Sequence, residues 1–260
     1  GLEVARVEYA ASLSAEWLDP VRLGVYQPWT ASMDEGWTRW VLDEFRFPYR
    51  AVHDARIQAG DLRRDFDCLI VPNLSPGEIL EGRSAKQVPS RYAGGIGRRG
   101  LENLVRFVEA GGRVVLLGKA CPLAFGRSKD QVADALAPPA AGTPAETKDF
   151  ACPGSILRAR VETSHPLALG FGAEIPIYVS DGPILAVKGL GAVLTYPERD
   201  TLLSGWVRGE AALAGSAALV EVPDGEGRWI LFAFRPQHRG QTHGTFRLLF
   251  NAIYRVSSRP

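Results

Sequence analysis

The residues of this sequence that are best suited to chemistry lie in one polar stretch, Phe234 to Thr245, between the apolar run Trp229 to Phe234 and a helical stripe of apolar side chains. Open α/β sheets bind ligands at the carboxyl ends of their strands, so a strand that ends at Phe234 would bring these polar groups to a binding edge. Gln27 and Trp29 follow an earlier apolar run and are expected at the same edge. The alternative is a helix start whose Thr and His side chains cap backbone groups. The candidate ligand or docking residues are Gln27, Trp29, Arg235, Gln237, His238, Arg239, Gln241 and His243.

Cys121 is a weak candidate for a catalytic nucleophile, because it follows the apolar run Val114 to Leu117 and lies just past a predicted strand. A reactive thiolate needs an imidazole base and a group that orients the base. His238 and His243 are the candidate bases, but no spacing in the chain guarantees their approach. The alternatives are a structural cysteine or a disulfide between Cys121 and Cys152.

Motifs for other chemistries are weak. The segment from Gly95 to Gly100 matches GxGxxG, but a long connection precedes it instead of a strand, so a loop that enters a helix is expected rather than a dinucleotide site. None of the four histidines belongs to an HxxE or HExxH motif, and no GxSxG segment occurs. We therefore expect no metal site, no cofactor and no serine nucleophile.

Composition excludes two classes of partner. Thirty basic against 29 acidic residues leave a formal charge of +1, too small for a dedicated nucleic-acid or anionic-membrane binder. No apolar run approaches the ~18 residues of a membrane span. The sequence starts Gly1-Leu2-Glu3-Val4 without an initiator Met, so a fragment or processed chain is expected.

The elements that must position the polar stretch form a regular pattern in the first half. Short apolar runs alternate with amphipathic segments, which predicts a parallel sheet covered by helices. Helical stripes are expected around Trp37 to Phe45 and Leu101 to Val108, with a short helix or turn within Ile57 to Phe66. The predicted strands are Leu23 to Tyr26, Tyr49 to His53, Cys68 to Val71 and Val114 to Leu117.

The second half is rich in strands, which are followed by a helical stripe from Phe246 to Ile253. The fold class is therefore α/β, a three-layer sandwich with a mainly parallel central sheet and a β-rich second half. We expect an extension or linker over 1–20 and one domain over 21–256, with long loops at 74–100 and 137–150. The predicted strands are Ser155 to Val161, Ile175 to Ser180, Ala192 to Tyr196, Leu202 to Val207, Ala217 to Val222 and Trp229 to Phe234.

Five segments carry a family resemblance: Tyr26 to Trp40, Phe107 to Gly112, Cys152 to Ser155, Leu203 to Trp206 and Arg235 to Phe246. They resemble the region after the catalytic domain in a group of bacterial zinc-carboxypeptidase-like proteins. That region is similar to the class I glutamine amidotransferase-like, flavodoxin-like fold. The resemblance covers most of residues 20 to 254.

The resemblance implies that the fold is kept and that the catalytic residues are missing. The zinc motifs of the peptidases belong to another domain and have no matching positions here. Active amidotransferases carry a cysteine at the tight elbow directly after the central strand and a later His-x-Glu pair. Here the elbow falls near Gly118, before Cys121, and no histidine is followed two positions later by Glu.

Three hypotheses follow. The first is a non-catalytic accessory domain, a pseudoenzyme that packs on, or presents a peptide or small molecule to, a carboxypeptidase-type catalytic domain of the same parent chain. The second is a cysteine-dependent hydrolase or amidotransferase-like enzyme that uses Cys121 with His238 or His243. The third is a sensor that binds sugars or peptides at the sheet edge. The resemblance also implies an exported protein, periplasmic or extracellular.

Overall fold

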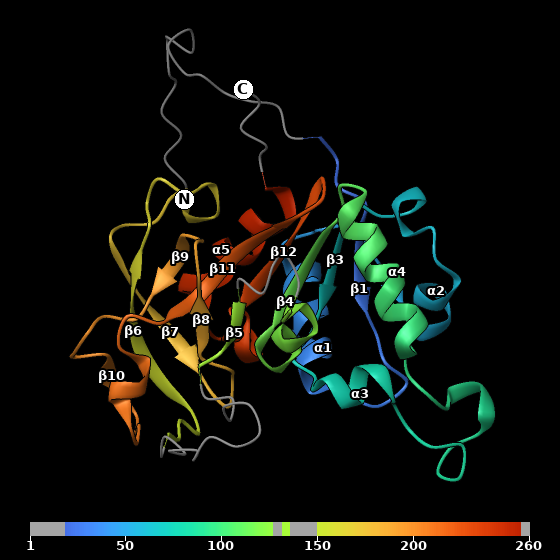
Figure 1. Ribbon diagram of the computed structural model, residues 1–260, viewed down its shortest axis with the longest axis horizontal. Helices are drawn as coiled ribbons and strands as arrows, with labels where there is room; N and C mark the ends of the chain where they lie inside the picture. Colours follow the sequence, from blue (N-terminus) through green and yellow to red (C-terminus); the bar gives the residue numbers. More distant parts are fainter. Residues whose placement is uncertain (1–18, 127–131, 136–149, 256–260) are drawn as a thin grey trace, which may run out of the picture.

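The computed structural model describes residues 19–126, 132–135 and 150–255 (Figure 1). Its centre is a parallel sheet whose strands lie in the order β2-β1-β3-β4-β12, each in register with its neighbours. The apolar runs of the sequence form β1, β3, β4 and β12 because both faces of these strands are covered, whereas the edge strand β2 leaves Arg50 and Ala51 exposed. Their bounds are β1 (Leu23–Tyr26), β2 (Tyr49–Val52), β3 (Cys68–Val71), β4 (Arg113–Leu117) and β12 (Gly227–Phe232).

Helices cover the two faces of the parallel strands, and side chains alternate between two cores. Ile70 and Val115 point to the core that also holds α1 and α5 side chains, whereas Leu69 and Val114 point to the core beneath α2 and α4. The long helices are therefore amphipathic. Their bounds are α1 (Met33–Glu44), α2 (Asp54–Ala59), α3 (Pro76–Leu80), α4 (Gly97–Glu109) and α5 (His243–Tyr254).

Antiparallel strands extend the sheet on the other side of β12, on the left of Figure 1. A hairpin turn at Gly225, with φ of 60°, joins β11 to β12, and β9, β6 and β10 then continue the sheet. The described residues thus form a mixed α/β fold around one twelve-stranded sheet. The added strands are β5 (Val132–Asp134), β6 (Ser155–Val161), β7 (Glu174–Val179), β8 (Leu185–Val187), β9 (Ala192–Thr195), β10 (Leu202–Ser204) and β11 (Ala217–Asp224).

The strands predicted from the sequence agree with the structure to within a few residues, and the main differences lie in the connections. The connection expected over 74–100 contains α3, which begins with a capping box between Ser75 and Glu78. The strand expected up to Val207 ends at Ser204. The loop expected over 137–150 and the extension over 1–20 lie outside the described residues, apart from residues 19, 20 and 150.

The GxGxxG segment serves close packing of helices. A Cβ atom at Gly95 would lie 2.3 Å from the carbonyl oxygen of Ile79 in α3, and one at Gly100 would lie 2.5 Å from Cβ of Ile96. Larger side chains at either position would separate α3 from α4 or displace the Ile96 side chain. The segment runs into the first turn of α4 and no strand directly precedes it, so these contacts account for Gly95 and Gly100, whereas Gly97 adopts a positive φ of 62°.

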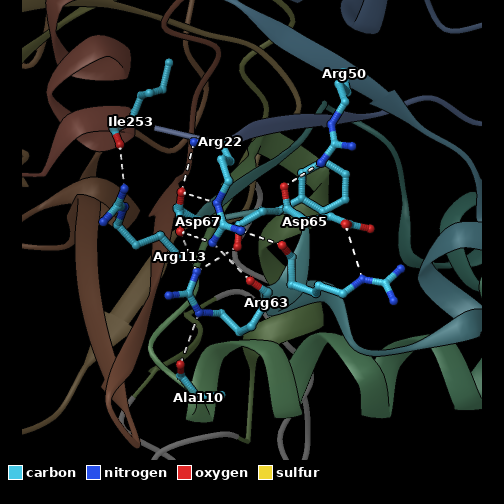
Figure 2. A network of polar contacts seen from close by, with 10 residues as sticks. Arg22, Arg50, Arg63, Asp65, Asp67, Ala110, Arg113 and Ile253 are labelled. Atoms are coloured by element: carbon cyan, nitrogen blue, oxygen red, sulfur yellow. Dashed lines mark hydrogen bonds and ion pairs between the residues drawn. The ribbon is translucent and has the colours of Figure 1, made fainter. Parts of the chain in front are cut away.

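An arginine network ties the amino ends of the parallel strands together (Figure 2). Asp67, directly before β3, accepts hydrogen bonds from the backbone N–H and the guanidinium of Arg22 and from the guanidinium of Arg63. The bonds from Arg22, followed by those from Arg63, hold the pKa of Asp67 well below its usual range.

Within the part of the chain that the structure describes, no helix combines the length and apolarity that crossing a lipid bilayer requires.

Candidate ligand-binding site

A pocket of about 460 Å³ opens at the carboxyl edge of the parallel strands, within the size range of small-molecule sites. The loops after β1, β3 and β12 meet here, and β7 contributes Tyr178. Open α/β sheets place ligand sites at this edge because the loops after neighbouring strands converge there. The lining residues are Ala31, Ser32, Met33, Asp34, Trp37, Asn73, Leu74, Glu78, Tyr178, Arg235, His238 and Arg239.

Asp34, in the first turn of α1, forms the acidic part of the pocket and is 8% exposed. Its Oδ2 atom accepts hydrogen bonds from the backbone N–H of Asn73 at 2.9 Å and from the Gln237 amide at 3.0 Å. Burial raises the pKa of Asp34, although the Asn73 bond and the charge of Arg235 act in the opposite direction. The carboxyl group is thus fixed by the two segments that follow β3 and β12.

Gln237 is the residue that holds Asp34 in place. Its side chain is fully buried, and its Nε2 atom donates to Asp34 and to the Thr38 hydroxyl at 2.9 Å. The segment after β12 is therefore anchored to α1 by one amide group. This anchor sets the positions of Arg235 and His238 on either side of it.

Arg235 and His238 share one aromatic neighbour. The His238 ring stacks on Tyr178 at a centroid distance of 3.9 Å, and the Arg235 guanidinium lies 5.6 Å from the same ring. Burial, together with the charges of Arg235 and Arg239, lowers the pKa of His238 to about 4. At neutral pH the pocket therefore presents two cations and an uncharged imidazole.

Three buried polar atoms of this segment have no hydrogen-bond partner among the described residues. They are Nε of Arg235, Oε1 of Gln237 and Nδ1 of His238. Buried polar groups are nearly always paired, so unpaired ones require an explanation. Arg235 and His238 line the pocket. A bound ligand would explain why their polar atoms are left without protein partners.

The turn after His238 is strained. Arg239 has φ of 50°, in the left-handed region that non-glycine residues rarely adopt. The next residue, Gly240, has φ of 63°, and a Cβ atom there would lie 2.6 Å from the Trp40 ring. Packing of Trp40 on Gly240 fixes the turn and directs the Arg239 side chain to the pocket.

The structure places the candidate residues named from the sequence in separate parts of the sheet edge and its surroundings. Arg235, His238 and Arg239 line the pocket, and Gln237 lies behind it. The remaining four candidates, Gln27, Trp29, Gln241 and His243, are not among its lining residues.

Trp29 and Gln27 belong to a neighbouring aromatic cluster. The Trp29 ring stacks on His53 at 4.0 Å and lies 4.9 Å from Tyr92, while the Nδ1–H of His53 donates to the Gln27 carbonyl. His243 is exposed at the start of α5 and stacks on Phe246. Gln241 is also exposed.

Solved structures share this architecture. A cytoplasmic protein from Salmonella typhimurium matches 91% of this chain and 98% of its own, with a TM-score of 0.52 and 14% identity. A ThuA-like protein from Bacteroides uniformis matches 92% of this chain and 93% of its own, with a TM-score of 0.48 and 11% identity. The structural neighbours thus include a ThuA-like protein. This is a likeness of fold.

A β-galactosidase from Bacillus circulans sp. alkalophilus also matches, over 89% of this chain but only 31% of the galactosidase, with a TM-score of 0.50 and 11% identity. No protein-family model matches the sequence, and no curated protein matches it. The association with a carboxypeptidase therefore stays a prediction from the sequence.

The tight turn that the sequence places near Gly118 lies directly after β4. Gly118 directly follows β4 with φ of 53°, and a Cβ atom there would lie 2.1 Å from the Asn73 side-chain oxygen. Cys121 lies beyond the elbow, is fully buried, and directs its thiol to the carbonyl oxygens of Phe232 and Leu116. Burial raises its pKa far above the usual value.

All three cysteines are free thiols, so the disulfide considered between Cys121 and Cys152 is not formed. The thiol of Cys152 bonds instead to the carbonyl oxygen of Val179 at 3.3 Å. Among the described residues there is no group of three or more His, Cys, Asp or Glu side chains that could hold a metal ion.

Sequence reasoning missed Asp34, Asn73 and Tyr178 as pocket residues. Asp34 lies next to the N-cap Ser32, where an acidic residue is ordinarily explained by helix capping and the helix dipole. Asn73 comes directly after the Val71-Pro72 end of a buried strand, and this position was a usable indication of the sheet edge. Tyr178 belongs to β7, and nothing local predicts its approach to His238.

Proposed function

We propose that this chain is a non-catalytic ligand-binding domain on an amidotransferase-like, flavodoxin-like scaffold. The parallel strands lie in the order β2-β1-β3-β4-β12, which corresponds to the flavodoxin-like order 2-1-3-4-5. Ligands of such sheets bind at the carboxyl ends of the strands, and the pocket beside Asp34 and Arg235 occupies that position.

One observation carries the proposal: the pocket keeps buried polar atoms without partners while the elbow beside it has no side chain. Arg235 and His238 supply two of those atoms. Gly118 occupies the elbow, and Asn73 Oδ1 fills the space that a side chain there would need. This arrangement supports binding and offers no nucleophile at the position where the amidotransferase-like fold would use one.

The cysteine-enzyme alternative has less support. A thiolate at Cys121 would have to form in a fully buried site against a raised pKa. Of its two candidate bases, His243 stacks on Phe246 at the protein surface, away from the pocket lining. His238 lines the pocket, but no contact between its ring and Cys121 occurs within the described residues.

The proposal retains an accessory role beside a catalytic peptidase domain of the same parent chain. Its support is the sequence resemblance. The likeness to a β-galactosidase shows that the fold also occurs as about a third of a longer chain. A peptide or another small molecule held at the sheet edge is the ligand that such a domain would present.

A pocket-blocking substitution tests the proposal. Ala31 is exposed and lines the pocket, so Ala31→Trp fills part of it without removing a polar group. Ala85→Trp is the matched control, because Ala85 is exposed and outside the lining. In a thermal-shift screen of a diverse small-molecule library, we expect compounds that raise the Tm of the wild type and of Ala85→Trp but not of Ala31→Trp. Equal shifts in all three proteins, or no shift in any, would refute the proposal.

A further inference from the structure

We propose that the pocket binds a small carboxylate that carries a hydroxyl or amino group on the neighbouring carbon. The inference rests on the proposed binding function and adds the chemical class of the ligand. It combines a cationic side of the pocket, formed by Arg235 and Arg239, with a hydrogen-bond acceptor at Asp34.

The cationic side fits a carboxylate. Arg235 and Arg239 both line the pocket, and neither forms an ion pair with an acidic side chain among the described residues. The Nε atom of Arg235 is buried and has no hydrogen-bond partner in the described part of the chain. Guanidinium groups bind carboxylates through two parallel hydrogen bonds, and a group already held against an aromatic ring loses little freedom in doing so. Tyr178 provides that ring for Arg235.

Arg239 adds the second guanidinium at the mouth of the pocket. It is exposed, and its recorded side-chain contact is a 3.9 Å approach to the Met33 sulfur. Its left-handed backbone is held by the packing of Gly240 on Trp40. A strained residue with an otherwise unused charge at a pocket mouth is typical of ligand contacts.

The acceptor at Asp34 requires a donor on the ligand. The two hydrogen bonds recorded for its carboxyl group both reach Oδ2, which leaves Oδ1 available to a ligand in the pocket. A bare anion would have no donor to offer this oxygen. A hydroxyl or ammonium group next to the carboxylate would meet it while the carboxylate pairs with the arginines.

The charge balance of the lining limits the charge of the ligand. Two acidic residues, Asp34 and Glu78, line the same pocket as the two arginines. A multiply charged anion such as phosphate would be repelled by the carboxylates while it is attracted by the guanidinium groups. A singly charged hydroxy acid or a zwitterionic amino acid matches both sides.

Three ligands of one carbon skeleton test the inference: propionate, lactate and alanine, the last two as both enantiomers, with inorganic phosphate as a fourth probe. Propionate, lactate and alanine differ only in the group on the carbon beside the carboxylate. Dissociation constants are measured by ligand-observed NMR titration at pH 7 and low ionic strength. We expect lactate or alanine to bind at least about fivefold more tightly than propionate or phosphate, and the tighter of the two identifies a hydroxy acid or an amino acid.

Two variants separate the contacts. Arg239→Gln, at an exposed position, should weaken the binding of every carboxylate ligand by about fivefold or more. Asp34→Asn should reduce the preference for lactate or alanine over propionate to less than about twofold. Arg99→Gln is the control, because Arg99 is exposed and outside this pocket. Circular dichroism and Tm verify that each variant folds.

The inference is overturned by equal binding of propionate, by tightest binding of phosphate, by a lack of effect of Arg239→Gln, or by no binding of any probe. If no probe binds but the library screen yields neutral compounds that Ala31→Trp excludes, the ligand class fails and the binding function stands. If the screen yields nothing that depends on the pocket, the proposed function itself fails.

Discussion

At the residue scale, the burial of the thiols makes a direct prediction about reactivity. Cys68, Cys121 and Cys152 are all buried, and desolvation is the main reason that each pKa is raised, to about 11 for Cys68. Because the thiolate is the reactive form, Ellman's reagent at pH 8 should modify the native protein at least roughly 100-fold more slowly than the unfolded protein, which should titrate all three cysteines. A single thiol that reacts at the rate of a free peptide would revive the cysteine-enzyme hypothesis.

Gly240 is a residue at which a single added methyl group should disturb the turn that carries Arg239. Its φ of 63° costs an alanine about 1–2 kcal/mol, and the added Cβ meets the Trp40 ring at 2.6 Å. We expect Gly240→Ala to lower the free energy of unfolding by about 2 kcal/mol or more in urea titrations. Gly36→Ala, in α1 with no atom within 4 Å of its Cβ position, is the control and should be neutral or stabilising. Equal effects at both positions would contradict this account of the turn.

At the element scale, the sequence predicts most of the fold because hydrophobic periodicity is a local property. The run Cys68 to Val71 is apolar throughout, and it forms β3 with the same bounds. The three-residue strands β5 and β8 are too short to show any alternation, so pairing with neighbours decides them. Helices within the connections are even harder to predict from the sequence, because α3 depends on a capping box inside a stretch rich in Gly and Pro.

The candidate site was only half predictable for a related reason. Arg235, His238 and Arg239 follow a recognisable strand, so their place at the sheet edge follows from topology. Asp34 is held in the site by long-range hydrogen bonds, from Asn73 across 39 positions of sequence and from Gln237 across 203. Trp29 follows β1 at the same edge but stacks on His53 instead. Side-chain pairings of this kind depend on packing that no sequence window contains.

Asp67 joins separate elements at the amino edge of the parallel strands, as Gln237 does at the carboxyl edge. Its carboxylate joins the residue before β1, Arg22, to the start of β3 (Figure 2). We expect Asp67→Asn to lower the free energy of unfolding by about 2 kcal/mol, because it weakens several charge-assisted hydrogen bonds at once. Glu102→Gln, which removes an exposed carboxylate that pairs with Arg98, should change it by less than about 0.5 kcal/mol. Similar losses in chemical denaturation would show that the network adds no more than an ordinary surface pair.

At the scale of the whole molecule, the parallel and antiparallel parts form one unit. Six residue pairs join β11 to β12, and one apolar core contains Ile70 of the parallel part together with Leu157 and Ile177 of the antiparallel part. The pocket depends on this continuity, because Tyr178 of β7 must reach the segment that follows β12. The antiparallel strands therefore shape the site as well as extending the sheet.

Glu221 of β11 links this assembly to α5 and predicts how stability depends on pH. It accepts hydrogen bonds from Arg255 at 2.9 Å and Arg228 at 3.1 Å, and lies 3.2 Å from Nε2 of His165. Burial alone would raise the pKa of Glu221, but the bonds from His165 and Arg255 outweigh burial and lower the pKa from 4.5 to about 2.

A carboxylate whose pKa is lower in the folded than in the unfolded state stabilises the fold fully above the unfolded value of 4.5, and this contribution is lost as pH falls from 4.5 through about 2. Glu221→Gln should therefore lower the free energy of unfolding at pH 7 by about 3 kcal/mol, because it removes the carboxylate whose ionised form Arg255, Arg228 and His165 stabilise. Urea titrations between pH 7 and pH 2.5 should show the wild type and the variant converging as the pH falls below 4.5. Glu174→Gln, at an exposed pair with Arg158, should run parallel to the wild type over the same range. A gap between wild type and Glu221→Gln that stays constant down to pH 2.5 would mean that Arg255, Arg228 and His165 do not hold the Glu221 carboxylate in its ionised form.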